Sequence, residues 1–319
     1  MNESSSVFGC FGAQCGVWVM GEGAGGTAAS AVADIERTLL GWHERFSRFI
    51  GDSELSRLNR DPRVEVPVSG VMARFVAAAL SAAEASGGLV DPTLLYDLEH
   101  AGYSRDLSGS PVPLRMALEL APARMPAAAS PTASWRDVSV DLDRKVVRRP
   151  PGVGLDSGGV AKGFFADVLA GSLRSHLAYA VDCAGDLRIG GLAREVHVAS
   201  PFDHSTLHTF VVSEMGVATS GIGKRSWLDG DVRPAHHLLD PMTGRPAYTG
   251  VVQATALAPS ALEAEWRAKA ALLSGPAGAP SWLPHGGVLV LDDGTHVVLD
   301  PRVDQWYPVR STSRGGAVR

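Results

Sequence analysis

The order of strand-like and helix-like segments constrains the fold of this chain more than any other feature. Residues 15–23, 138–149 and 178–191 have strand patterns, and several further strand-like segments follow in the last third of the chain. Segments with the helical spacing of apolar residues, notably residues 27–49 and 260–275, lie between only some of these strand-like segments. A doubly wound parallel sheet needs a regular alternation of strand and helix, which is missing here. We therefore predict an α+β fold with mixed, largely antiparallel sheets and packed helices.

The chain is expected to form one main domain. Its 319 residues, of which 45% are hydrophobic and 20% charged, have the composition of a globular protein with a well-buried core. We expect a single domain at residues 15–309, a flexible N-terminal segment at 1–14 and a disordered tail at 310–319. Residues 108–134 are rich in Pro, Ala and Ser and have no clear period, which indicates a long loop or insertion.

The charge distribution and the cysteines indicate which kinds of partner the protein can bind and in which cellular compartment it is located. The net charge of −5 arises from mixed signs, and no long basic run is present that would follow a nucleic-acid backbone. Cys10, Cys15 and Cys183 are an odd number and form no CxxC pair, so they give no disulfide framework. The N-terminus lacks the basic region of a signal peptide, and we find no apolar stretch typical of a transmembrane helix. We predict a cytoplasmic protein with no nucleic-acid partner and no membrane insertion.

A glycine-rich segment, residues 155–163 with the sequence LDSGGVAKG, precedes a predicted helix. Glycines before a helix can bring backbone N–H groups close to an anion, and the helix dipole there favours negative charge. The order of residues differs from the GxxxxGK[ST] phosphate loop and from the dinucleotide pattern GxGxxG. Taken alone, the segment is more simply interpreted as a tight turn than as a phosphate cradle.

Two adjacent histidines, His236 and His237, precede a turn in the segment RPAHHLLDPMTGRPA at residues 233–247. If the backbone there is extended, the two side chains point to opposite faces, so only one of them can enter a given site. A surface turn with solvated histidines is one interpretation. A general base or a phosphate-neutralising histidine is the other.

The predicted helix at residues 260–275 has the most informative charge pattern. Ser260 and Glu263 match a capping box, and Gly275 lies where the helix should end. At about 100° per residue, Glu265 and Lys269 fall in the middle of the apolar arc. Such a pair either forms a buried ion pair, with a desolvation cost of several kcal/mol per ion, or lines a polar pocket. We favour the pocket.

Seven segments of the chain, in this order, resemble the FAD:protein FMN transferase family, also called ApbE. They lie at residues 46–59, 90–93, 155–163, 181–191, 218–221, 236–246 and 258–275. The resemblance implies an α+β fold of the T-fold type that binds FAD. It also implies cleavage of the FAD diphosphate with a divalent cation, usually Mg²⁺, release of AMP, and attachment of FMN to a Thr or Ser of a partner flavoprotein.

The resemblance also implies roles for individual residues. Contacts with FAD are expected from Phe49, Leu89, Val90, Asp91, Asp156, Lys162, Thr219, Ser220 and His237. Asp156 or His237 would assist removal of the proton from the acceptor hydroxyl, while Lys162 would stabilise charge on the diphosphate. Gly159 would offer its backbone carbonyl to the cation, and Glu265 would supply the carboxylate ligand.

The expected cation site departs from the family pattern. The family's helix segment reads Ala-Asp-x-x-x-Thr, whereas this chain has Ala264-Glu265 followed by Lys269. An ammonium group repels Mg²⁺ and could instead take its place beside the diphosphate. Three alternatives therefore stay open: a flavin transferase with altered metal dependence, an FAD diphosphatase that yields FMN and AMP, and a flavin-binding module without activity. The acceptor protein and the oligomeric state are not defined by the sequence.

Overall fold

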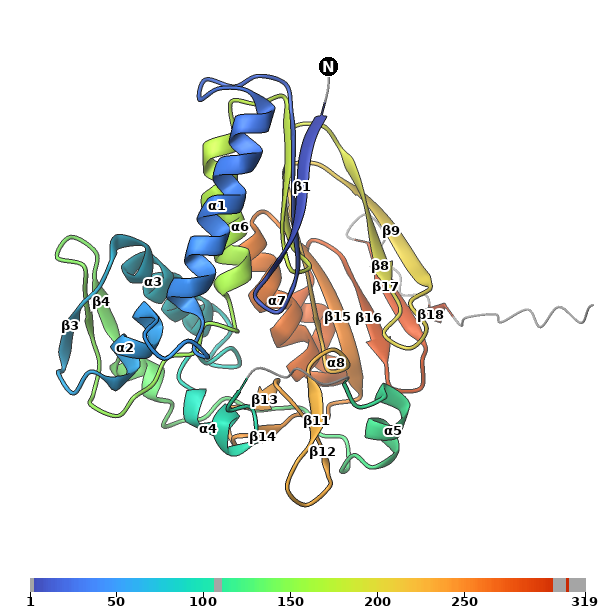
Figure 1. Ribbon diagram of the computed structural model, residues 1–319. Helices are drawn as coiled ribbons and strands as arrows, with labels where there is room; N and C mark the ends of the chain where they lie inside the picture. Colours follow the sequence, from blue (N-terminus) through green and yellow to red (C-terminus); the bar gives the residue numbers. More distant parts are fainter. Residues whose placement is uncertain (1–2, 106–110, 301–307, 310–319) are drawn as a thin grey trace, which may run out of the picture.

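The computed structural model describes residues 3–105, 111–300 and 308–309, and an antiparallel sheet forms its centre (Figure 1). Within these residues the sheet has nine strands in the order β1-β2-β6-β7-β10-β15-β16-β17-β18, and neighbouring strands pair in antiparallel fashion. The strands are β1 Glu3–Cys10, β2 Ala13–Met20, β6 Ala178–Cys183, β7 Asp186–Gly190, β10 Gly216–Gly221, β15 Val251–Ala258, β16 Gly287–Leu291, β17 His296–Leu299 and β18 Pro308–Val309. The predicted α+β class is confirmed.

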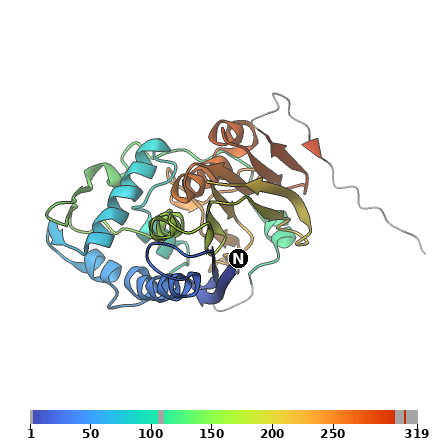
Figure 2. The ribbon, with the colours of Figure 1, turned by 90° about the horizontal axis from the view of Figure 1, so that it is seen from above.

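Three long helices pack along one face of this sheet, as Figures 1 and 2 show. Helix α1 (Ala28–Phe46) contacts β1 and β2, α6 (Ala161–Leu173) contacts β6 and β7, and α7 (Ala261–Leu273) contacts β10 and β15. Helices α6 and α7 also contact each other, which brings the segment before α6 close to the inner face of α7. No helix in the described ranges is long and apolar enough to cross a lipid bilayer.

Smaller elements surround this core. The remaining helices are α2 Glu54–Arg60, α3 Gly70–Ala85, α4 Leu95–His100, α5 Leu114–Glu119 and α8 Gly275–Gly278, with the 3₁₀ turns η1 Ser134–Asp137 and η2 Ala279–Trp282. The remaining strands are β3 Glu65–Pro67, β4 Ser139–Asp141, β5 Val146–Arg148, β8 Arg194–Ala199, β9 Thr206–Val212, β11 Ser226–Leu228, β12 Pro234–His236, β13 Leu239–Asp240 and β14 Arg245–Pro246. The β8–β9 hairpin packs its Val196 and Val212 against Ile189 and Val217 of the central sheet.

Local sequence signals explain where α7 begins. Ser260 is its N-cap, and the side-chain oxygen accepts a hydrogen bond from the backbone N–H of Glu263 at 3.1 Å. The Glu263 carboxylate accepts a hydrogen bond from Arg267 Nε at 2.7 Å, which is an i,i+4 ion pair. Gly275 follows the helix with φ of +69°, a conformation that suits glycine. The predicted helix and its first cap are confirmed.

The N-terminal residues differ from the prediction of a flexible segment at 1–14. Residues 3–10 form β1, which pairs with β2 over its whole length, from Glu3 opposite Met20 to Cys10 opposite Ala13. The connecting residues Phe11 and Gly12 have φ of 54° and 69°, as in a tight hairpin turn. The polar sequence of β1 concealed the strand because an edge strand is held by its backbone ladder and needs few buried side chains.

The predicted insertion at 108–134 is only partly irregular. Residues 106–110 lie outside the described ranges, and residues 114–119 form α5, which the Pro- and Ala-rich composition did not indicate. The rest is anchored by backbone hydrogen bonds, from Met125 N to Tyr248 O at 2.9 Å and from Ala127 N to Leu273 O at 2.8 Å. The predicted tail at 310–319 also lies outside the described residues.

Candidate functional site

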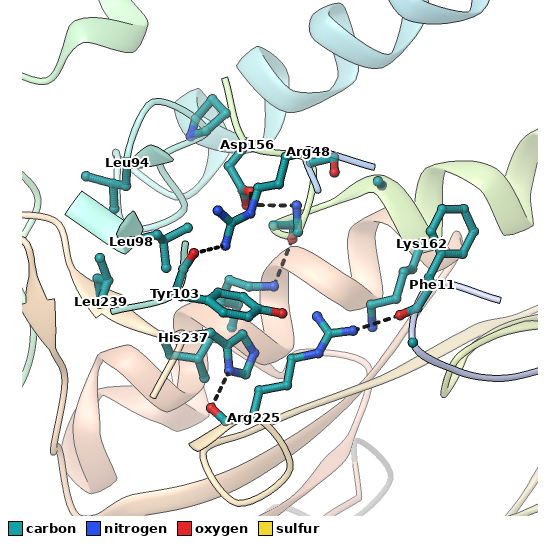
Figure 3. Close-up of a pocket in the computed structure, with 18 of the residues that line it drawn as sticks. Phe11, Arg48, Leu94, Leu98, Tyr103, Asp156, Lys162, Arg225, His237 and Leu239 are labelled. Atoms are coloured by element: carbon teal, nitrogen blue, oxygen red, sulfur yellow. Dashed lines mark hydrogen bonds and ion pairs between the residues drawn. The ribbon is translucent and has the colours of Figure 1, made fainter. Parts of the chain in front are cut away.

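A cavity of about 350 Å³ lies where the end of α1, the segment before α6 and the inner face of α7 meet (Figure 3). This volume is in the range of small-molecule sites. Segments distant in sequence contribute to its wall, at 46–50, 89–94, 156–162, 224–226 and 237–239. The sequence-predicted residues that line it are Phe49, Leu89, Val90, Asp91, Asp156, Gly159, Lys162, His237 and Lys269. The fold therefore gathers most of the predicted set around one space.

Asp156 is held in place by its own segment. Its backbone N–H donates to Pro92 O at 2.8 Å, and its Oδ2 accepts a hydrogen bond from Gly158 N at 2.8 Å. The side chain of Asn59 donates from Nδ2 to the carbonyl of Leu155 and accepts at Oδ1 from the N–H of Leu155, both at 2.8 Å. These contacts fix the turn that precedes α6, so the position of the carboxylate is set by the backbone around it.

Arg48 is a pocket residue that the sequence analysis did not single out. Its guanidinium carbon lies 4.4 Å from the centre of the Phe49 ring and 4.5 Å from that of Tyr103. Its Nε is 3.3 Å from Asp156 Oδ1, and its Nη2 donates to Tyr103 O at 2.6 Å (Figure 3). The charged group thus contacts two aromatic rings, which themselves meet edge to face at 5.4 Å between centres, and it is paired with a predicted catalytic carboxylate. The only signal in the sequence was its place next to Phe49.

Lys162, in the first turn of α6, forms an ion pair with Asp186 at the start of β7. Asp186 is buried and does not line the cavity, whereas Lys162 does. Burial alone would lower the pKa of Lys162, but the Asp186 and Glu265 carboxylates outweigh it and raise this pKa. Lys162 is therefore a positively charged group on the cavity wall, with a carboxylate behind it.

The two adjacent histidines point to different surroundings, as the alternation predicted. His236 is buried and packs edge-on against the Tyr248 ring at 4.8 Å, away from the cavity. His237 lines the cavity, and its Nδ1 is 3.4 Å from the backbone carbonyl of Arg225 (Figure 3). Burial, together with the Arg225 charge, holds the pKa of His237 well below its usual value. This imidazole is neutral at neutral pH.

Glu265 and Lys269 lie one turn apart on the inner face of α7. Glu265 is buried, and its Oε2 accepts a hydrogen bond from Gly163 N at 2.8 Å, so that it caps the start of α6. Lys269 lines the cavity and donates from Nζ to the backbone carbonyl of Gly159 at 2.8 Å. The two side chains approach to 4.0 Å between Nζ and Oε1. Burial raises the pKa of Glu265 to about 7. Both sequence interpretations therefore hold in part: Lys269 faces the pocket, and Glu265 is the buried member of an ion pair.

The expected Mg²⁺ site does not fit these contacts. Mg²⁺ requires oxygen ligands at about 2.0–2.1 Å in near-octahedral geometry. One expected ligand, the carbonyl of Gly159, already accepts a hydrogen bond from Lys269, whose ammonium has no lone pair to offer. Another, Glu265 Oε1, has no hydrogen-bond partner among the described residues, but the Lys269 ammonium lies 4.0 Å from it, so a cation bound to this oxygen would adjoin a like charge. In the described ranges, no group of three His, Cys, Asp or Glu side chains is arranged to hold a metal ion.

Two of the predicted flavin contacts, Thr219 and Ser220, lie in β10 and do not line the cavity. The hydroxyl of Thr219 is 2.9 Å from that of Thr255, its direct partner on β15. The ladder between these two strands thus accounts for the position of Thr219. A role for either hydroxyl in binding the flavin stays a prediction.

The fold and the cavity define an α+β protein with a small-molecule-sized pocket whose wall includes both aromatic rings and ammonium groups. The aromatic rings of Phe49 and Tyr103 contribute to one part of the cavity wall, and the ammonium groups of Lys162 and Lys269 contribute to another. More particularly, the chain belongs to the ApbE family, whose sequence model matches residues 11–291.

Curated relatives carry the name FAD:protein FMN transferase. The protein of Treponema pallidum is 30% identical over 247 residues, which cover 70% of this chain and 66% of the relative. That of Salmonella typhimurium is 28% identical over 231 residues, covering 69% of this chain and 64% of the relative. This chain thus aligns with slightly less than two thirds of the length of these two relatives.

Solved structures share the fold. The ApbE protein of Thermotoga maritima superposes with a TM-score of 0.74 at 23% identity, covering 92% of this chain and 96% of that one. The flavinyl transferase ApbE of Pseudomonas stutzeri, in its apo form, gives a TM-score of 0.72 at 21% identity, with 91% of each chain covered. The ApbE-like architecture predicted from the sequence is confirmed.

Proposed function

We propose that this protein is an FAD:protein FMN transferase that binds FAD in the described cavity and transfers FMN to a Thr or Ser of a partner flavoprotein. One observation carries the proposal: the cavity collects Phe49, Asp156 with Lys162, and His237 from three segments that are distant in sequence. These are residues for which the family resemblance implies contact with FAD. The names of the curated relatives support the same activity.

The reaction is a phosphoryl transfer. The acceptor hydroxyl oxygen forms a bond to the phosphorus of the FMN half, the bond from that phosphorus to the bridging oxygen breaks, and AMP leaves with this oxygen. Lys162, oriented by its ion pair with Asp186, stabilises the negative charge on the diphosphate. The proton of the acceptor hydroxyl passes to a base on the cavity wall.

Asp156 and His237 are the two candidates for this base. Asp156 is paired with Arg48 and bonded to Gly158 N, so its carboxylate is held in a fixed position on the cavity wall. His237 Nδ1 faces the carbonyl of Arg225, which can only accept a hydrogen bond, so Nδ1 carries the proton and Nε2 keeps its lone pair. Asp156→Asn and His237→Gln, compared for FAD affinity and for transfer rate, distinguish them: the base is the residue whose loss slows transfer more than it weakens binding.

The direct test is to incubate the protein with FAD and a peptide that carries the flavinylation motif of the family. Mass spectrometry should show the peptide with FMN attached, and chromatography should show AMP in equal amount. Lys162→Met should slow transfer by roughly 100-fold or more, because a charge-stabilising group is lost. Lys145→Met, at an exposed turn between β4 and β5, is the matched control and should leave transfer unchanged. Absence of both products with Mg²⁺, with Mn²⁺ and with a chelator would refute the proposal.

The same assay separates the two alternatives from the sequence. An FAD diphosphatase would release AMP and free FMN and leave the peptide unmodified. A flavin-binding module without activity would retain intact FAD and release no AMP, an outcome that the ammonium of Lys269 on the Gly159 carbonyl makes worth testing. Mg²⁺ as a cofactor, a cytoplasmic location and the absence of a nucleic-acid partner stay predictions from the sequence.

A further inference from the structure

We propose that the ammonium group of Lys269 is a built-in replacement for the divalent cation at the diphosphate, so that this protein binds FAD without a metal ion. The inference rests on the proposed function, because it concerns how the same cavity receives the same ligand. It goes further by assigning to one residue of this chain a role that a bound ion would otherwise fill.

The contacts of Lys269 are those expected of a bound cation. Its Nζ lies 2.8 Å from the carbonyl oxygen of Gly159 and 4.0 Å from Oε1 of Glu265. A backbone carbonyl and a carboxylate are oxygen ligands of the kind that hard divalent cations bind. Here the two groups flank an ammonium that reaches them from α7. Glu265 Oε1 makes no hydrogen bond with any described residue, and its carboxylate acts on the ammonium groups of both Lys269 and Lys162.

The charges are arranged so that the cavity side is positive. Lys162 and Lys269 line the cavity, whereas their carboxylate partners, Asp186 and Glu265, are buried and do not line it. Each ammonium therefore has a carboxylate behind it. The carboxylates outweigh the effect of burial on the pKa of Lys162, whereas burial still lowers the pKa of Lys269 and Glu265 offsets only part of that cost. Each also keeps N–H donors that can point toward the cavity, because an ammonium has three. A dianionic diphosphate that enters this cavity meets two fixed positive charges.

A divalent cation could use the same ligands only if Lys269 moved away. The carbonyl of Gly159 has a second lone pair, but a metal ion bound there at about 2.0–2.1 Å would lie close to the ammonium whose hydrogen bond this oxygen already accepts at 2.8 Å. An ammonium in contact with a dication would also be repelled by it, since like charges destabilise each other at short range. Lys269 and a metal ion are therefore alternatives at this position.

The first experiment measures FAD affinity of the unaltered protein by calorimetry, once with excess EDTA and once with Mg²⁺. We expect the same dissociation constant in both buffers. Lys269→Thr removes the ammonium and leaves a hydroxyl and free space. It should bind FAD roughly tenfold or more weakly in EDTA, because a charge-assisted contact is lost, and should regain affinity when Mg²⁺ is added. Lys269→Met, which fills the space without a charge or a ligand, should be weakened in both buffers.

A second experiment needs no FAD. Electron paramagnetic resonance of Mn²⁺ reports how much of the ion is free in solution, and it should show no binding to the unaltered protein and binding to Lys269→Thr. Circular dichroism confirms that both variants are folded. If the unaltered protein binds FAD only with Mg²⁺, or itself takes up Mn²⁺, the inference about Lys269 is overturned while the proposed function stands. If FAD binds in neither buffer, the proposed function fails, and this inference fails with it.

Discussion

The contact between α6 and α7 depends on one glycine, and this contact sets the positions of Lys162 on α6 and of Glu265 on α7. A Cβ added at Gly163 would lie 2.4 Å from the backbone oxygen of Ala261, 2.6 Å from its carbonyl carbon and 2.7 Å from the nitrogen of Leu262. Backbone atoms cannot swing away as a side chain can. Gly163→Ala should therefore force the two helices apart by about 1 Å, given that carbon atoms in contact prefer 3.5–4.0 Å.

The same helix offers a control that isolates this packing effect. Gly171 is also in α6, but it is exposed, and a Cβ there would meet no atom within 4 Å. Alanine is preferred over glycine in a helix by about 1 kcal/mol, and this gain applies to both substitutions. Overpacking costs roughly 3 kcal/mol at the upper end of its usual range, which suits a clash with backbone. We expect Gly163→Ala to be about 2 kcal/mol less stable than the unaltered protein and Gly171→Ala to be about 1 kcal/mol more stable.

Urea unfolding followed by circular dichroism measures both variants. The expected gap of about 3 kcal/mol should appear as a lower unfolding midpoint for Gly163→Ala at an unchanged slope. Because Gly163 N also donates to Glu265, FAD binding should weaken in Gly163→Ala and stay unchanged in Gly171→Ala. Equal stability of the two variants would show that the α6–α7 contact yields to an added methyl group, and the reasoning would be wrong.

Three further predictions concern stability. Burial lowers the pKa of His236 to about 3. Below the unfolded pKa of about 6.5 the unfolded state binds a proton that the folded state excludes, so the free energy of unfolding should fall with decreasing pH by up to about 1.4 kcal/mol per pH unit. Urea unfolding at pH 7 and at pH 5 should show a smaller fall in His236→Asn than in the unaltered protein. Arg149 is fully buried and donates to three backbone carbonyls at the end of α2. Arg149→Met should therefore lower the free energy of unfolding in urea by roughly 3 kcal/mol, and a decrease of less than about 1 kcal/mol would contradict this. Asp167 accepts hydrogen bonds from Ala261 N and Leu262 N, both at 2.9 Å, so Asp167→Ala should lower stability by roughly 1–2 kcal/mol, and an unchanged melting temperature would argue against this cap.

Local signals in the sequence were sufficient where an element is stabilised locally. Helix α7 was predicted because Ser260, the apolar period and Gly275 all lie within one segment. The strand β1 was not, because its alternate side chains are exposed and its stability comes from pairing with β2. A short helix such as α5 was hidden for a similar reason, since its Leu114 and Ala117 are buried by distant parts of the chain.

The candidate site was predicted where the family resemblance assigns a role to a residue and missed where a residue's role depends on partners that meet it only in space. Phe49, Asp156 and Lys162 lie in such segments and share the cavity. Arg48 was missed, although it contacts Asp156 and Tyr103, because neither partner is near it in the sequence. The contact of Lys269 with the Gly159 carbonyl could not be predicted either, because helical periodicity gives the face on which a side chain lies but not the atom that it reaches.

The structure also changes how the segment LDSGGVAKG can act on a phosphate. A cradle of backbone N–H groups would need those groups to be available, yet Gly158 N donates to Asp156, Ala161 N to Ser157 O and Gly163 N to Glu265. Three N–H groups of this segment are thus already bonded to protein oxygens, Glu265 among them. What the segment offers to the cavity is the ammonium of Lys162, together with the carbonyl oxygen of Gly159 that positions the ammonium of Lys269. Since a Cβ at Gly159 would meet only Val90, at an ordinary 3.8 Å, it is this carbonyl, and not the lack of a side chain, that gives the residue its place in the site.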